Sequence, residues 1–185
     1  SLSVDIKSFS MWFRFLTPRN LQKLPPSCVY SYFEIVPNNQ ATSVSVASGA
    51  DITIPLSAIN LQSIPKRMYL YIRKNDSDLT YNDADSFFKI KQVTINYMNR
   101  SGLLSNCITE NLYQMSHENG YNGNFDTFAK YNGSVLCLQF GKDIGLGSLY
   151  SSGQLIQNQL SLTITATNIS NATITAPTLY CQIVY

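Results

Sequence analysis

Charged side chains are scarce in this chain. Asp, Glu, Lys and Arg make up 13% of its 185 residues, about half the share usual in soluble proteins. The net charge of +2 is too small for a protein that grips nucleic acid, because phosphate binding needs a clustered basic face. The neutral polar residues and tyrosines that fill the gap suit strands packed against neighbours, and they suit a freely diffusing enzyme less well.

Histidine and patterned cysteine are also lacking. His117 is the only histidine, and a zinc site or catalytic triad around it would need partners that the sequence does not place nearby. The four cysteines, Cys28, Cys107, Cys137 and Cys181, have spacings that match no zinc or redox motif. Cys137 and Cys181 stand in apolar runs, which predicts small buried side chains and reduced thiols. We therefore expect no enzyme, and no catalytic, cofactor-binding or metal-ligating residues.

Long apolar runs are missing as well. No run approaches the ~20 residues that a membrane-spanning helix needs, and no signal-peptide pattern opens the chain, so we expect no membrane span. The chain starts at Ser1 almost directly before a strand-like run, which is typical of a fragment or a processed module. Apolar residues make up 44%, enough for one domain to bury its own core.

Two motifs resemble ligand sites but fit turns better. The carboxylates of Asp76, Asp78, Asp83 and Asp85 are of the kind that holds Ca²⁺. Their spacing lacks the order of a calcium loop, so turn formation is favoured and ion binding stays the alternative. In the run GKDIGLG over residues 141–147 the lysine precedes the position that a phosphate loop requires, which favours a tight turn.

Strand signals dominate the rest of the chain. Alternating or β-rich runs predict strands over residues 10–16, 29–36, 42–46, 51–56, 66–74, 87–98, 134–140, 160–167 and 173–185. Pro55 places its strand at a sheet edge or strand end. Helical spacing predicts one short helix between Asn106 and Asn119, where Asn119-Gly120 supplies a stop. About eight strands at this length predict an all-β fold, an eight-stranded jelly-roll sandwich with one short helix, as a single domain over residues 1–185.

Aromatic side chains on such a sandwich have two interpretations. Trp12, Tyr69, Tyr71, Tyr121 and Tyr131 would suit stacking against sugars, so a carbohydrate-binding β-sandwich, lectin-like or receptor-binding, is the alternative function. Strand tyrosines more often lie at sheet faces or subunit contacts, and we favour the second interpretation.

The order of the elements resembles that of a known family. A strand, an acidic loop, a long strand, the segment NRSGLLS, a short helix, Asn-Gly and the run GSVLCLQFGKDIGL follow one another up to Leu146. This order resembles the C-terminal jelly roll of double jelly-roll viral major capsid proteins, especially those of virophages, Polinton-like viruses and adintovirus-like elements. The resembling segments are residues 64–120, 133–146 and 168–185, about half of the chain.

The resemblance implies a structural coat protein. Members of that family place two jelly rolls side by side, and three copies form a pseudo-hexameric capsomer of an icosahedral shell. The chain is too short for both jelly rolls, so it resembles the C-terminal module of a longer capsid protein. The implied partners are copies of itself, in homotrimers and the capsid, and penton or cement proteins, without direct contact to nucleic acid. The implied location is the virion capsid, assembled in the host cytoplasm or nucleus.

Four residues are predicted to lie near subunit contacts: Tyr113, Met115, Tyr121 and Tyr131. They belong to the expected helix and to the glycine- and asparagine-rich segment that follows it. We expect residues 121–130 to be dispensable for folding but needed for assembly.

Overall fold

The computed structural model describes residues 8–15, 27, 29–75, 79, 87–147 and 150–185. The chain divides into two compact units, Ser1–Tyr32 and Phe33–Tyr185. The described residues of the first unit form no helix or strand. The strand predicted over residues 10–16 is therefore wrong for residues 10–15, and Leu16 lies outside the described residues. An aromatic run has β-propensity, but a strand also needs a partner to pair with.

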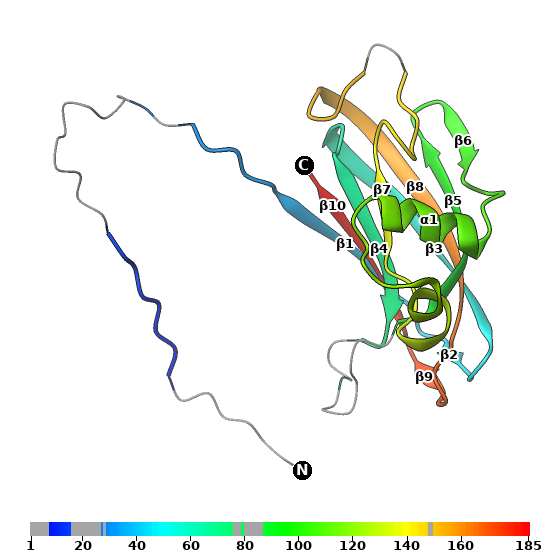
Figure 1. Ribbon diagram of the computed structural model, residues 1–185. Coiled ribbons are helices and arrows are strands. Elements are labelled where there is room, and N and C mark those ends of the chain that lie inside the picture. Colours follow the sequence, from blue (N-terminus) through cyan, green and yellow to red (C-terminus); the bar gives the residue numbers. More distant parts are fainter. Residues whose placement is uncertain (1–7, 16–26, 28, 76–78, 80–86, 148–149) are drawn as a thin grey trace. The chain divides into compact units, whose positions relative to one another are not determined.

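Two four-stranded antiparallel sheets build the second unit (Figure 1). The first sheet has the order β1 (Ile35–Ala41), β10 (Thr178–Val184), β4 (Arg67–Arg73) and β7 (Leu136–Gln139). The second has the order β3 (Asp51–Ser63), β8 (Leu155–Thr167), β5 (Lys89–Tyr97) and β6 (Arg100–Leu103). The short strands β2 (Ser45–Val46) and β9 (Ile174–Thr175) pair with each other. Apart from the β5–β6 hairpin, each connection between strands of the two main sheets crosses from one sheet to the other, so the predicted eight-stranded jelly roll is confirmed.

The core lies between the two sheets and follows the alternation of the sequence. Met68, Leu70 and Ile72 of β4 are completely buried, whereas Tyr69 and Tyr71 between them are half-buried on the outer face. The facing sheet contributes buried residues at alternate positions of its strands: Val93, Ile95 and Tyr97 from β5, and Leu162, Ile164 and Ala166 from β8. A period of two is therefore a reliable signal wherever a strand has one buried face.

Several strand bounds differ from the prediction, and the differences at β3 and before β1 have a structural cause. β3 continues to Ser63, but its register against β8 shifts between Leu56 and Ile59, and Ala58 has a φ of +59°. This irregularity interrupts the alternation, so the sequence predicts only the first half of the strand. Residues 29–34 are not a strand. The pairing of β1 with β10 begins at Ile35, opposite Val184, and one backbone bond, from Tyr185 N to Glu34 O at 3.0 Å, precedes it.

The free edges of β1 and β3 both carry proline. β3 is an edge strand, as Pro55 predicts, and β1, which carries Pro37, is the edge of the other sheet. Proline cannot donate to a further strand, so these edges discourage pairing with another chain.

The one α-helix of the described residues, α1 (Thr109–Glu118), packs against β7 (Figure 1). Ile108 N donates to Asn111 Oδ1 at 3.3 Å at its start, and Asn119 and Gly120 end it, the glycine with a φ of +109°. A π-helical turn that the sequence does not predict follows at Thr127–Tyr131. In the described part of the chain, each helix is too short or too polar to cross a bilayer.

Candidate assembly surface

A polar network joins the end of α1 to the turn after β7. The side-chain amide of Asn119 is buried and donates to Cys137 O at 2.9 Å and to Asp143 Oδ2 at 2.6 Å. The same carboxylate oxygen accepts the backbone N–H of Gln139 at 2.8 Å. These bonds satisfy buried groups on three elements at once and fix the helix on the sheet.

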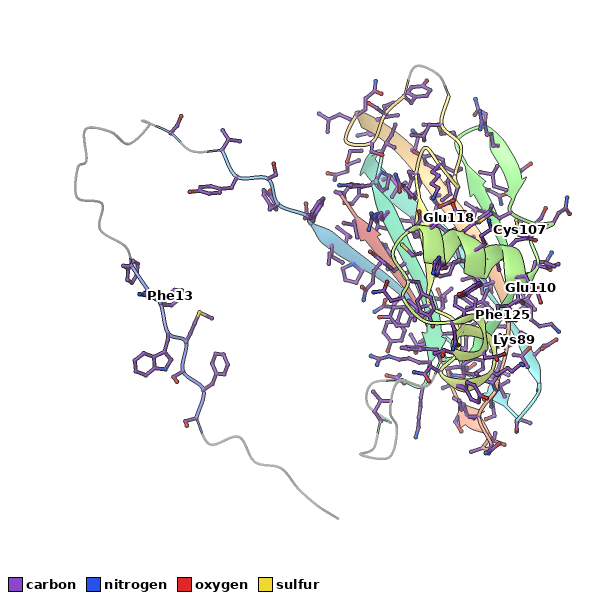
Figure 2. All side chains as sticks on the ribbon, viewed as in Figure 1. Phe13, Lys89, Cys107, Glu110, Glu118 and Phe125 are labelled. Atoms are coloured by element: carbon purple, nitrogen blue, oxygen red, sulfur yellow. The ribbon has the colours of Figure 1, made fainter. Side chains whose placement is uncertain are left out.

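An ion pair continues this network to the surface. Lys142 Nζ lies 2.8 Å from Glu118 Oε2 (Figure 2 labels Glu118). The hydrogen bond from Lys142, followed by one from Gln114, lowers the pKa of Glu118, and the same pair raises the pKa of Lys142. Both side chains are roughly half exposed, so the pair contributes little to stability.

The glycine-rich run over residues 141–147 opens with a turn, as predicted. Gly141 has a φ of +86° and donates from its N–H to Ile144 O at 2.8 Å. Asp143, within this turn, is the carboxylate of the network described above. The run therefore contributes to the attachment of α1.

An aromatic cluster surrounds Tyr113 on the outer side of α1. Its ring meets those of Phe125 and Phe128 edge-to-face, with centroid distances of 5.4 Å and 5.6 Å, and the ring of Tyr121 at 6.4 Å. Its hydroxyl donates to Gly123 O at 3.2 Å. Burial, followed by the neighbouring Tyr113, raises the pKa of Tyr121. The cluster holds the segment after the helix in one conformation.

The four predicted interface residues occupy different environments. Tyr113 and Tyr121 meet in this cluster, and Met115 is half-buried against the main core. Tyr131 is the one that projects freely, with 72% of its surface exposed. Tyr113 and Met115 lie on α1, Tyr121 lies just after it and Tyr131 ends the π-helical turn, and their role in subunit contacts stays a prediction.

One expectation about this segment needs correction. Phe128 is 0% exposed and its carbonyl accepts the Ser134 hydroxyl at 3.1 Å. A deletion of residues 121–130 would therefore remove a core side chain and change the fold as well as the surface. Point substitutions at exposed positions are the appropriate test.

The outer face of the first sheet carries a second aromatic group, of which the sequence analysis named Tyr71 but not Tyr180. Tyr71 stacks on Tyr180 with a centroid distance of 5.0 Å and an interplanar angle of 7°. Gln182 Nε2 donates to Tyr71 Oη at 2.9 Å, and the Arg73 guanidinium lies 5.0 Å from the Tyr180 ring centroid. Tyr180 is only 6% exposed, so β10 is buried on both faces. The run of apolar residues at successive positions in β10 was the available signal.

The cysteines behave as small apolar residues. Cys137 and Cys181 are buried, as predicted, and with Cys107 they are free thiols. Burial raises the pKa of Cys181 to about 12. Cys28 lies outside the described residues, and so do Asp76, Asp78, Asp83 and Asp85 of the acidic stretch. Among the residues that the structure describes, no three metal-ligating side chains gather at one point.

The geometry defines a jelly-roll protein whose side-chain networks serve packing. Residues 35–132 match the profile of the family "Major capsid protein V20 C-terminal domain", and the chain belongs to this family. It is 27% identical over 211 residues to the "Putative capsid protein V20" of Sputnik virophage, an alignment that covers 100% of this chain and 35% of that protein. This chain therefore spans about a third of the length of the relative that it matches.

Two solved structures share the fold. A chain of the cryo-EM structure of the Sputnik virophage superimposes with a TM-score of 0.84 and 28% sequence identity, over 91% of this chain and 38% of that one. The crystal structure of the mavirus major capsid protein gives a TM-score of 0.69 at 14% identity, over 92% of this chain and 40% of that one. The second match shows the fold alone.

Proposed function

We propose that this chain is the C-terminal jelly-roll module of a longer major capsid protein, with a structural and non-enzymatic role in an icosahedral virion shell. The observation that carries the proposal is the family match over residues 35–132. The superposition on the Sputnik virophage chain, with a TM-score of 0.84 over only 38% of that chain, supports a module within a larger subunit.

The physical character of the second unit supports a structural role. Two sheets enclose a continuous apolar core, and α1 is fixed to them by buried hydrogen bonds. Such a scaffold resists deformation, whereas its surface has few charges that would be costly to bury in a large interface. The prolines on β1 and β3 discourage strand-to-strand pairing at those edges, which favours contacts made by side chains and loops.

For the mode of assembly, we propose homotrimers that act as pseudo-hexameric capsomers, with Tyr113, Met115, Tyr121 and Tyr131 near the contacts between subunits. Exposed Tyr131, in the same π-helical turn as Phe128 of the aromatic cluster, is a side chain of the kind enriched at protein interfaces. Penton or cement proteins are further partners, and the protein does not itself bind the genome. The site of action is the virion capsid, after assembly in the host cytoplasm or nucleus.

The test is the size of the complete capsid protein in solution. The full-length gene product should form trimers or larger assemblies in light scattering, and regular particles in electron micrographs. A protein that stays monomeric and binds a glycan in a titration would contradict the proposal and favour the carbohydrate-binding alternative.

A further inference from the structure

Arg67, at the start of β4, forms no ion pair with any residue that the structure describes. It alternates with the buried Met68 along β4, which places it on the outer face, and its neighbours across the sheet are Val184 of β10 and Gln139 of β7. The side chain is half-buried, and its Nε is buried without a hydrogen-bond partner. No described residue forms an ion pair with its guanidinium. A half-buried arginine without an acceptor is costly, and native structures rarely keep one without a reason.

A groove of about 400 Å³ lies beside Arg67 on the same face. It is lined by Phe33, Ile35, Lys66, Arg67, Tyr69 and Val184. Phe33 and Ile35 remain 63% and 58% exposed, which is unusual for a pair of large apolar side chains that sit side by side in one groove. Lys66 Nζ lies 4.5 Å from the centroid of the Phe33 ring, so the second cation is held over the apolar wall.

The groove therefore combines two positive charges with an apolar wall and lacks an acid. Glu34 is the adjacent acid in the sequence, but it lines a different hollow together with Asn60 and Tyr185. The cations of the groove are thus uncompensated among the described residues, and the natural complement is a carboxylate beside apolar groups.

We propose that this groove binds a segment of a neighbouring polypeptide of the shell, in which an Asp or Glu is flanked by apolar side chains. The carboxylate pairs with Arg67 and Lys66, and the apolar groups cover Phe33 and Ile35. The inference rests on the proposed function, because the neighbouring polypeptide is another part of the shell.

The chemistry favours a protein segment over other anions. An arginine fork matches a carboxylate with two parallel hydrogen bonds. A phosphate backbone would gain nothing from the exposed phenyl ring of Phe33 and the sec-butyl group of Ile35, and a small ligand would leave most of its surface in water in so open a groove. Arginine and tyrosine in one partly apolar patch are the composition typical of protein interfaces.

The first experiment places a photo-crosslinking amino acid at Ile35 in the full-length capsid protein, with Leu155, which is 84% exposed, as the control position. After irradiation of assembled protein, mass spectrometry should find the Ile35 probe joined to peptides that contain Asp or Glu next to apolar residues. Cross-links only to acid-free peptides, to nucleic acid or to lipid would overturn the proposal, and so would equal patterns from both positions.

The second experiment removes the charge. Arg67→Met keeps the aliphatic stem, so the isolated protein should unfold at the same or a higher temperature, whereas its assembly should require about tenfold more protein. Lys89→Met, the matched loss of one positive charge on the other sheet, should assemble normally. Normal assembly of the Arg67→Met protein would contradict the proposed binding in the groove. A lowered unfolding temperature that accounts for its assembly defect would contradict it as well.

The outcomes separate the two proposals. If particles form without a cross-link from Ile35, the proposed binding in the groove is contradicted, whereas the proposed role in a shell is not. Soluble oligomers that cross-link from Ile35 to an acidic segment but never form particles contradict the shell function and support the groove.

Discussion

The side-chain amide of Asn119 donates to the carboxylate of Asp143 over 2.6 Å, and this contact joins the end of α1 to the turn that follows β7. Asn119 also donates to Cys137 O at 2.9 Å, and Ser116 Oγ of the helix accepts the N–H of Cys137 at 3.1 Å. The helix is thus attached by hydrogen bonds to β7 itself and to the residues beyond it.

Replacement of Asn119 by Ala should lower the free energy of unfolding by about 1–3 kcal/mol, because it leaves Cys137 O and Asp143 with fewer buried partners. Urea unfolding should show a lower midpoint with an unchanged slope. Gln114→Ala, on the exposed side of the same helix, is the control and should change stability far less. Equal effects of both substitutions would show that the network contributes no more than a surface contact.

Gly133 should be intolerant of any side chain. Its φ is +87°, and a Cβ there would collide with the backbone carbonyl of Phe87. Gly133→Ala should destabilise the fold by about 4 kcal/mol or more, or prevent folding. Gly153 has a similar φ of +86° with open space around it, so Gly153→Ala isolates the backbone strain and should cost about 1–2 kcal/mol. Comparable losses in thermal unfolding would contradict the collision with Phe87.

Tyr131 should affect assembly without affecting the fold. It is 72% exposed, so Tyr131→Ser should leave the unfolding temperature unchanged while it raises the protein concentration needed for assembly severalfold. Leu155→Ser, at a position that is 84% exposed on the second sheet, is the matched control. Normal particles from the Tyr131 variant, measured by light scattering and electron microscopy, would remove this residue from the interface.

Cys181 should make the fold sensitive to alkali. Burial raises its pKa from 9.0 to about 12, so the unfolded chain loses this proton at a lower pH than the folded protein does. The stability that the neutral Cys181 thiol gives to the folded state is fully present below pH 9.0. It is lost as the pH rises toward about 12. The free energy of unfolding should therefore fall less steeply between pH 9.0 and about 12 in the Cys181→Ala variant than in the wild type. Cys107→Ala should change this slope less, because the Cys107 thiol is less buried.

Native-state alkylation provides an independent measurement for the same residue. Half-buried Cys107 should react before Cys181, which should react only after unfolding, because a buried neutral thiol is a poor nucleophile. Rapid labelling of Cys181 in the folded protein would contradict both its burial and its raised pKa.

The strongest predictions from the sequence came from strands with one buried face. The alternation in β4 and β8 predicted their buried residues correctly, and Pro55 correctly marked an edge. The failures have a common cause, which is that pairing depends on residues far away in the chain. Residues 10–15 have β-propensity without a strand, and β3 runs past its register shift because β8 continues beside it.

The candidate site was less predictable. Tyr113 and Tyr121 could be assigned to the helix and to the following segment. Both of their rings, however, contact Phe128, which belongs to a π-helical turn that the sequence does not predict. Arg67 gave no sequence signal, because short basic runs usually mark solvated strand ends. Its missing partner becomes evident only when β1, β4 and β10 lie side by side.

Residue patterns close together in the chain determined that this protein is an all-β sandwich with one short helix, because burial on one face imposes a period of two or of 3.6 on its own segment. The tertiary structure alone decided which strands are neighbours, which face of β10 is covered and where uncompensated charge meets exposed apolar surface. Those properties arise from contacts between distant segments, such as Arg67 with Val184 and Asn119 with Asp143, and no local pattern encodes them.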